Sequence, residues 1–125
     1  MLLVSSGGAI GALLRFSLGN ILKFYFLNNF YATLSINIIG SFLIGYLVSL
    51  GYMKNMSESF IKYFLVIGLL GSFTTFSAFS YEVVDLLLSK KFFHGIFYII
   101  SSVFFCIIAA YMGIYINKVW LENTK

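Results

Sequence analysis

The sequence predicts an all-α membrane protein with four transmembrane helices. Hydrophobic residues make up 61% of the 125-residue chain and charged residues only 10%, whereas a globular domain in water carries roughly 25% charged residues. A water-facing surface cannot be built from this composition, so the expected solvent for most of the chain is a lipid bilayer. The sequence also contains long apolar segments of about 20 residues or more, the length that a membrane span requires.

Four apolar segments follow one another with short connections. The predicted spans cover residues 2–27, 30–52, 59–88 and 92–119. Many of the charged residues lie in or beside the connections and near the end of the chain: Lys54, Glu58, Lys90, Lys91, Lys118, Glu122 and Lys125. The chain has no proline and no segment long enough to link two domains. We therefore expect a single transmembrane domain over residues 1–125.

The basic residues are divided almost evenly between the two sides of the predicted bundle. One side carries Lys54, Lys62, Lys118 and Lys125, and the other carries Lys23, Lys90 and Lys91. Because basic residues normally mark the cytoplasmic side, this distribution leaves two alternatives open. The chain inserts in both orientations, or a difference of about one charge, together with Arg15, fixes one orientation. The basic residues form no patch, so we expect no nucleic-acid partner.

Small residues recur four positions apart on two of the spans. Gly7 and Gly11 share a face of the first span, and Ser41 and Gly45 share a face of the second. Pairs of this kind allow membrane helices to approach closely. A chain with four spans encloses little interior, so we expect it to gain packing by associating with other helices.

Two rows of polar side chains lie inside the predicted spans. They are Thr33, Asn37 and Ser41 on the second span, and Tyr98, Ser102 and Cys106 on the fourth. A polar group in lipid costs free energy unless it is partnered or hydrated. These rows therefore either join neighbouring helices or line a path for something polar. Arg15 in the first span also needs a partner, for which Glu82 and Asp85 are candidates, or else it extends to the membrane surface.

The third span contains "GLLGSFTTFSAFSYE" at residues 68–82, which is unusually polar for a membrane segment. A continuous helix over the whole span would be about 45 Å long, longer than a hydrocarbon core of about 30 Å. Small and hydroxyl-bearing residues gather near its centre: Gly68, Gly71, Ser72, Thr74 and Thr75. We expect the helix to be broken there, at mid-membrane, which frees backbone carbonyls able to bind a cation such as sodium. The alternative is an intact helix whose hydroxyl groups bond to its own backbone.

Three motifs together resemble the Fluc (CrcB) family of fluoride channels: "GGAIGALLRF", "NIIGSFLIGYL" and "GSFTTFSAFSYE". The resemblance covers all four spans. It implies a fluoride-selective channel that exports fluoride passively across the bacterial cell membrane. It also implies an antiparallel homodimer of dual-topology subunits, with two pores and one structural sodium ion (Na+) at the dimer centre. No metal-ligand cluster, nucleophile–base pair or phosphate-binding loop indicates an enzyme.

The resemblance also gives expectations for individual residues. The predicted fluoride pathway comprises Asn37, Thr75, Phe76, Phe79, Tyr98 and Ser102. The backbone carbonyls of Gly71 and Thr74 are the predicted sodium ligands, and Arg15 and Glu82 are assigned to a vestibule or to charge pairing. The chain departs from the family pattern at two positions. Ser72 replaces the second glycine of the third motif, and Cys106 stands where a hydroxyl residue is expected, although a thiol is a weaker donor.

Two other functions compete with this hypothesis. A small dual-topology multidrug antiporter also has four spans, but its mechanism needs a membrane-embedded carboxylate on the first span, where this chain has Arg15 and no acidic residue. A non-transporting membrane assembly protein would use the polar residues only to join helices. Cys106 is the single cysteine of the chain, so an intrachain disulfide is impossible.

Overall fold

The computed structural model describes residues 1–26 and 29–122, and the regular structure in these ranges is entirely helical. The elements are α1 (Leu2–Phe26), α2 (Asn29–Met53), η1 (Phe60–Leu70), α3 (Gly71–Phe73), α4 (Phe76–Leu88) and α5 (Phe92–Glu122). Four segments are long and apolar enough to cross a membrane, the third of them being η1, α3 and α4 together. This confirms the predicted all-α fold with four membrane-length helices. Leu27, the predicted end of the first span, and Lys125 lie outside the described residues.

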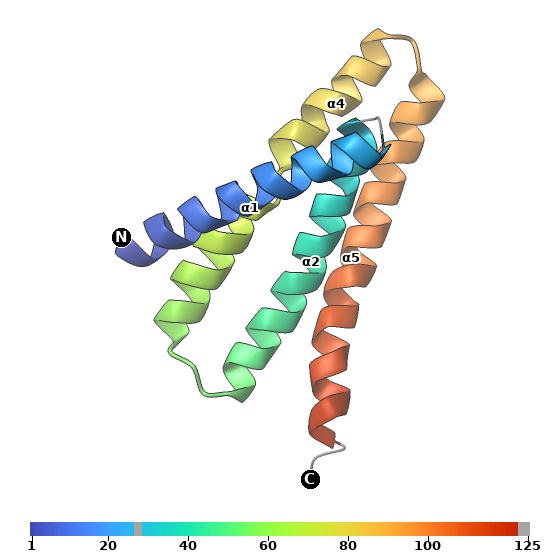
Figure 1. Cartoon of the computed structure of the whole chain (residues 1–125). Helices are drawn as coiled ribbons and strands as arrows, with labels where there is room; N and C mark the ends of the chain where they lie inside the picture. Colours follow the sequence, from blue (N-terminus) through green and yellow to red (C-terminus); the bar gives the residue numbers. More distant parts are fainter. Residues whose placement is uncertain (27–28, 123–125) are drawn as a thin grey trace.

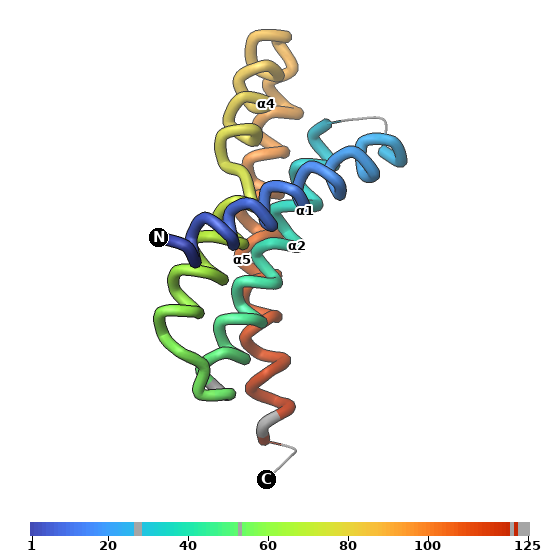
Figure 2. Tube along the Cα trace, turned by 60° about the vertical axis from the view of Figure 1, so that its left-hand side comes forward, coloured from blue at the N-terminus to red at the C-terminus, as the bar shows by residue number. Residues whose placement is uncertain are grey.

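The helices form an open arrangement around the long pair α2 and α5. These two helices pack side by side, and α1 crosses the molecule obliquely and packs mainly on η1 (Figure 1). After η1, the chain turns away, and α4 continues along the N-terminal half of α5 (Figure 2). The third segment therefore contacts α1 with one half and α5 with the other.

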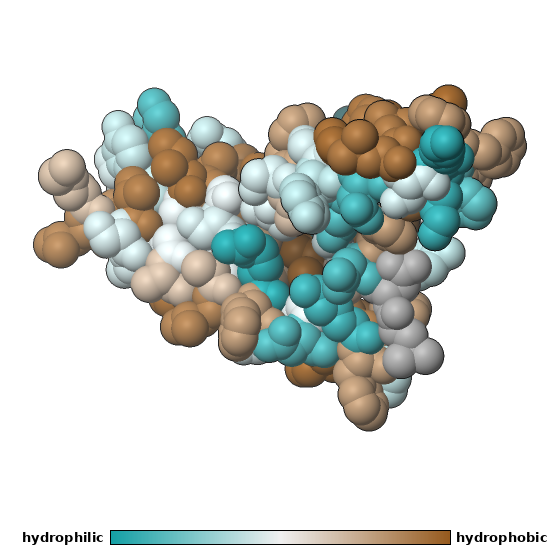
Figure 3. All heavy atoms as spheres, turned by 90° about the horizontal axis from the view of Figure 1, so that it is seen from above, coloured by the Kyte–Doolittle hydropathy of each residue, from teal (hydrophilic) through white to brown (hydrophobic). Residues whose placement is uncertain are grey.

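The outer surface of the helices is mostly apolar. Large side chains such as Phe16, Phe24, Phe97 and Ile107 are exposed. Seen from above, hydrophilic residues surround a recess near the middle of one end, while apolar residues cover much of the surrounding surface (Figure 3). Apolar exposure on this scale is unfavourable in water and suits a hydrocarbon solvent. The chain is a multi-pass membrane protein.

Glycines allow α1 to lie directly against η1. A Cβ atom at Gly7 would meet the Leu69 amide nitrogen at 2.9 Å, and one at Gly11 would collide with the Leu69 carbonyl. Gly68 faces α1 from the other side, because a Cβ there would lie 3.0 Å from the Gly7 Cα. The small residues of the first motif thus bring two helix backbones into contact, as such residues do in membranes.

Glycines also allow the backbones of α2 and α5 to lie in close contact. A Cβ at Gly45 would collide with the Ala110 carbonyl. Lower on the same interface, the buried side chain of Asn117 donates a hydrogen bond from Nδ2 to the Tyr46 carbonyl at 2.7 Å. The bond satisfies a polar group that would otherwise be unpaired in lipid.

Gly113→Ala is expected to destabilise the α2–α5 contact. Its Cβ would lie 2.7 Å from the Tyr46 amide nitrogen and collide with the Phe42 carbonyl, and overpacking of this kind costs about 1–3 kcal/mol. Thermal unfolding in detergent should show a lower Tm. Gly95→Ala is the matched control on the same helix, because the nearest atom to its Cβ would be a flexible side-chain end, Leu87 Cδ2, at 3.3 Å, and the next atoms lie at 3.7 Å. Equal Tm values for the two variants would contradict this packing.

The third segment changes its backbone type along its length. η1 is a π-helix, in which N–H groups bond five residues back, and α3 follows as a short helical turn. Thr74 (φ −80°, ψ 157°) and Thr75 (φ −145°, ψ 110°) are then extended, and α4 begins at Phe76. Gly71 itself has helical angles (φ −63°, ψ −30°). The extended residues are therefore the β-branched threonines, which favour extended backbone, and not the glycines.

Candidate functional site

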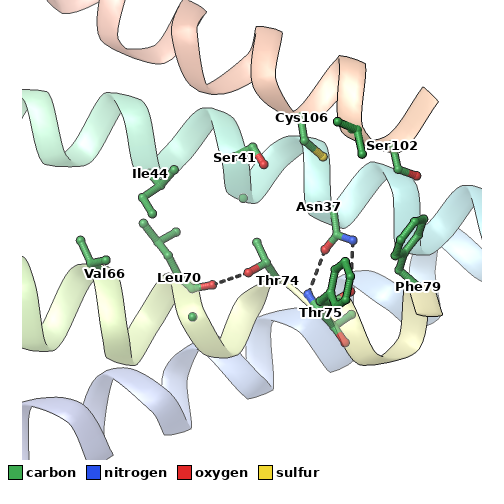
Figure 4. Close-up of a pocket in the computed structure, with 14 residues that line it drawn as sticks. Asn37, Ser41, Ile44, Val66, Leu70, Thr74, Thr75, Phe79, Ser102 and Cys106 are labelled. Carbon is green, nitrogen blue, oxygen red and sulfur yellow. Dashed lines mark hydrogen bonds between the residues drawn. The ribbon is translucent and has the colours of Figure 1, made fainter. Parts of the chain in front are cut away.

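A cavity of about 320 Å³ lies between α2, the third segment and α5, beside the extended threonines (Figure 4). Its lining brings together most of the residues that the sequence singled out: Asn37, Ser41, Gly71, Thr74, Thr75, Phe76, Phe79, Ser102 and Cys106. The remaining lining residues are Gly40, Ile44, Val66, Leu70 and Val103. The sequence analysis missed these five because apolar and small residues occur throughout a membrane chain. Tyr98, Arg15 and Glu82 do not line the cavity.

Asn37 holds the extended backbone at Thr75. Its Oδ1 accepts the Thr75 N–H at 2.9 Å, and its Nδ2 donates to the Thr75 carbonyl at 3.2 Å (Figure 4). One carboxamide therefore satisfies both backbone groups that an intact helix would have paired internally. One amide hydrogen of Asn37 is used in this way, and the second is left for another acceptor.

The threonine hydroxyls bond to nearby groups of their own segment. Thr74 Oγ1 donates to the Leu70 carbonyl at 2.9 Å. Thr75 Oγ1 accepts the Ala78 N–H at 3.2 Å and caps the start of α4, as an N-cap threonine commonly does. It also lies 3.2 Å from the Ser77 hydroxyl. The hydroxyl groups thus stabilise the two helix ends on either side of the extended residues.

Phe76 and Phe79 start α4 with neighbouring rings in different environments. The ring centroids are 5.5 Å apart, with 46° between the ring planes. Phe79 is only 8% exposed and forms a cluster with Val83, Leu86 and Tyr98, whereas Phe76 is 78% exposed in the single chain. The Phe79 and Tyr98 centroids are 5.1 Å apart at 59°. Tilted rings of this kind present edges, which carry partial positive charge, to their neighbours.

Ser102 and Cys106 bring the row from α5 into the cavity. Both residues line it and are one helical turn apart. Ser102 is 6% exposed, and its Oγ has no hydrogen-bond partner among the described residues. A buried hydroxyl without a partner costs free energy, so the position is suited to a ligand that the single chain does not supply.

Glu82 lies on α4, where hydroxyl groups from two other helices donate to it. Thr33 Oγ1 on α2 donates to Oε1 at 2.7 Å, and Tyr98 OH on α5 donates to Oε2, also at 2.7 Å. Each oxygen of the Glu82 carboxyl group therefore accepts a hydroxyl from a different helix. Thr33 begins the polar row on α2, and Tyr98 begins the row on α5. Both therefore bind Glu82 and do not line the cavity.

Arg15 is partly buried on α1, and no described carboxylate forms an ion pair with it. Its Nε is enclosed and has no acceptor within the described part of the chain. Neither Glu82 nor Asp85, the candidate partners named from the sequence, lies within ion-pair distance in the residues that the structure describes, and Glu82 is occupied by hydroxyl donors. Sequence spacing alone cannot show this, because α1 packs on η1 and not on α4.

Backbone oxygens are the groups here that suit a hard cation. No set of three His, Cys, Asp or Glu side chains in the described ranges could hold a metal. The carbonyl of Thr74 belongs to the extended segment and that of Gly71 to the helical turn before it, and neither accepts a hydrogen bond from any residue placed in the structure. Oxygens of this type bind sodium where a membrane helix is unwound. The chemistry of these two carbonyls is that of sodium ligands.

The chain is similar to known proteins over nearly its whole length. A family model described as CrcB-like protein, Camphor Resistance (CrcB), matches residues 2–114. A Dehalococcoides mccartyi protein named "Fluoride-specific ion channel FluC" is 34% identical over 125 residues, covering 99% of this chain and 96% of the relative. A Campylobacter jejuni protein with the same name is 44% identical over 119 residues, covering 94% and 97%. A Methanosarcina acetivorans protein named "Fluoride-specific ion channel FluC 1" is 42% identical over 113 residues, covering 90% and 86%.

Proposed function

Because the chain belongs to the CrcB-like protein family, we propose that it is a fluoride-selective ion channel through which fluoride leaves the cell passively. The family confirms the resemblance stated from the three sequence motifs. Its relatives are named as ion channels, which confirms the expectation that the chain is not an enzyme. The structural observation that carries the proposal is the cavity lined by Asn37, Phe79 and Ser102, whose buried hydroxyl has no partner among the residues that the structure describes.

Fluoride needs many weak partners on its way through a membrane. The ion is small and strongly hydrated, and transferring it bare into a low-dielectric medium costs tens of kcal/mol by Born solvation. A single strong site would lower this cost but would also hold the ion, because conduction requires binding weak enough for release. A row of weak donors lowers the cost at each step and lets the ion leave.

The cavity supplies donors of this kind. Ser102 contributes a buried hydroxyl that has no partner in the described ranges, and Asn37 contributes the amide hydrogen that Thr75 does not use. Phe76 and Phe79 contribute ring edges with partial positive charge, and the Thr75 hydroxyl proton is free to turn toward Ser77 or toward the cavity. We assign these residues to the fluoride pathway. A row of donors too narrow for chloride would select the smaller fluoride ion.

Tyr98 and Glu82 form a part of the proposed fluoride pathway that lies beside the cavity. The Tyr98 hydroxyl donates to Glu82, so it reaches fluoride only when that bond opens. Its ring packs on Phe79 and keeps the Phe79 edge in place. We assign Arg15, whose enclosed Nε has no acceptor in the described chain, to a vestibule where a cation attracts anions.

We propose that the working unit is an antiparallel homodimer of dual-topology subunits with two pores. The nearly even division of basic residues supports insertion in both orientations. Phe76, a cavity residue beside Phe79, is 78% exposed in the single chain, and a second copy would cover it. The helices enclose only a small core, which also favours association.

A structural sodium ion at the centre of this dimer would use the carbonyls of Gly71 and Thr74. Hard cations bind through several oxygen ligands, so two carbonyls are too few. An inverted second copy placed against the first would double the number. When bound, the ion neutralises carbonyl dipoles where the two extended segments meet. This arrangement places Thr74 and Thr75 at mid-membrane, where irregular backbone must be buried in protein or line a wet cavity.

The proposed location is the cell membrane of a bacterium. Hydrogen fluoride is a neutral weak acid that crosses lipid and releases fluoride in the less acidic cytoplasm. An open channel then lets fluoride run outward along its electrochemical gradient. A multidrug antiporter would need a carboxylate on the first span. The residues of α1 include no Asp or Glu, so this hypothesis is rejected.

Fluoride efflux from liposomes tests the proposal directly. Purified protein in vesicles loaded with potassium fluoride should release fluoride once valinomycin balances the charge, as recorded with a fluoride electrode. Vesicles loaded with potassium chloride should release chloride no faster than protein-free vesicles. Absence of fluoride release from well-folded protein would favour the non-transporting assembly protein, and equal release of both anions would contradict selectivity.

A further inference from the structure

Cys106 is the most nucleophilic group in the lining of the cavity, and it is the single cysteine of the chain. It lies on α5, is partly buried, and carries a free thiol. Asn37 and Ser41 on α2 line the same cavity (Figure 4). A thiol at this place is close to the polar groups of the pathway.

The neighbour of Cys106 in the cavity points independently to a ligand. Ser102 lies one helical turn before Cys106 and lines the same cavity. Only 6% of its surface is exposed, so the residue is 94% buried. Its hydroxyl is unpaired within the described chain. The lining of this cavity of about 320 Å³ therefore contains a thiol and, one helical turn away, a buried hydroxyl that has no partner among the described residues.

We infer that Cys106 is a modification site for small thiophilic electrophiles, such as a neutral organomercury halide, and that its modification closes the anion pathway. The closure rests on the proposed fluoride conduction, whereas the modification itself does not. Mercury prefers soft sulfur ligands, and methylmercury needs only one such ligand because it is linear and two-coordinate. A lone cysteine is thus sufficient.

The reaction is a ligand exchange that needs no oxidant or reductant. The Cys106 sulfur forms a bond to mercury, the mercury–chlorine bond of methylmercury chloride breaks, and chloride leaves. The thiol proton passes to water, so charge and atoms balance. The product replaces the S–H group by a bulky apolar group beside Ser102 and Asn37. Fluoride then loses a donor and the space that its passage requires.

The test uses purified full-length protein in liposomes, treated with methylmercury chloride and washed. Intact mass spectrometry should show one methylmercury group per chain, and fluoride efflux should be at least about tenfold slower, equivalent to a barrier about 1.4 kcal/mol higher. An excess of dithiothreitol should remove the mercury and restore the rate. C106S contains no cysteine, so it should gain no mass. Its fluoride efflux rate after treatment with methylmercury chloride should equal its rate before treatment.

C106S/I107C is the control for position. Ile107 is exposed on the same helix and does not line the cavity, so its thiol should be modified without slower efflux. No adduct on the native chain, an adduct without slower efflux, or equal slowing of C106S or C106S/I107C would each overturn the inference. Absence of efflux before treatment would contradict the proposed function instead, and the mass measurement would still decide whether the reagent reaches Cys106.

Discussion

Phe79→Ile is expected to slow fluoride efflux by at least about a hundredfold, which corresponds to a barrier higher by about 2.7 kcal/mol. The Phe79 ring lines the cavity, contacts Phe76 and Tyr98, and is almost fully buried. Isoleucine fills much of the same volume but has no ring edge with partial positive charge. The measurement is the initial rate of fluoride release from liposomes that contain equal amounts of folded protein.

Phe97→Ile is the matched control for this variant. Phe97 is exposed on α5 and does not line the cavity, so the same chemical change should leave the efflux rate within about twofold of the native rate. Size-exclusion chromatography should show that both variants keep the native oligomeric state, although Phe79→Ile loses some packing because its side chain is smaller. A native efflux rate in Phe79→Ile would show that this ring is not part of the pathway.

Asn37→Asp should be at least as damaging, because it brings a negative charge to the cavity. Two like charges about 4 Å apart repel by about 4 kcal/mol at an effective dielectric constant of about 20, enough to slow fluoride passage about a thousandfold. The variant also loses the Nδ2 donor, so the Thr75 carbonyl faces an oxygen in place of its partner. Fluoride efflux and thermal stability in detergent should both fall.

Asn117→Asp separates the effect on the pathway from the effect on stability. Asn117 is also a buried asparagine whose Nδ2 donates to a backbone carbonyl, but it lies between α2 and α5 away from the cavity. Its replacement should lower the Tm as Asn37→Asp does, while the efflux rate per folded protein stays close to the native rate. Equal losses of efflux in the two variants would mean that charge anywhere in the bundle is responsible.

The sequence predicted the helices because their signal is local. Long apolar segments can be solvated only by lipid, and the charges between them mark their limits. The polar rows on the second and fourth spans also indicated the right helix faces, since Asn37, Ser41, Ser102 and Cys106 all line one cavity. Helical periodicity is enough to place residues on a common face.

The position of the extended backbone depends on contacts that are remote in sequence. The sequence indicated the region from Gly68 to Thr75 as the place where the third segment loses its helical form, but not which residues in it do so, and Gly68 serves a close approach to α1. The residues that are extended are Thr74 and Thr75, and the group that pairs with the Thr75 backbone is Asn37 on another helix. Local propensity cannot reveal a hydrogen bond supplied by a side chain 38 residues away.

The partners of the charged residues could not be predicted from the sequence either. Arg15 and Glu82 have opposite charges and both lie within membrane-length helices, which made an ion pair a natural expectation. In the structure, Glu82 is bound by the hydroxyls of Thr33 and Tyr98. Helix packing decides this outcome, because α4 lies against α2 and α5 while α1 lies against η1.

The measurement that tests the central claim most directly is a high-resolution structure of the purified protein in fluoride. We predict ion density inside the cavity, within contact distance of the Phe79 ring edge and the Ser102 hydroxyl, in an assembly where a second inverted copy covers Phe76. A cavity filled by a lipid chain or by a neighbouring helix, with anions bound only elsewhere, would contradict the claim that fluoride crosses the membrane between these residues.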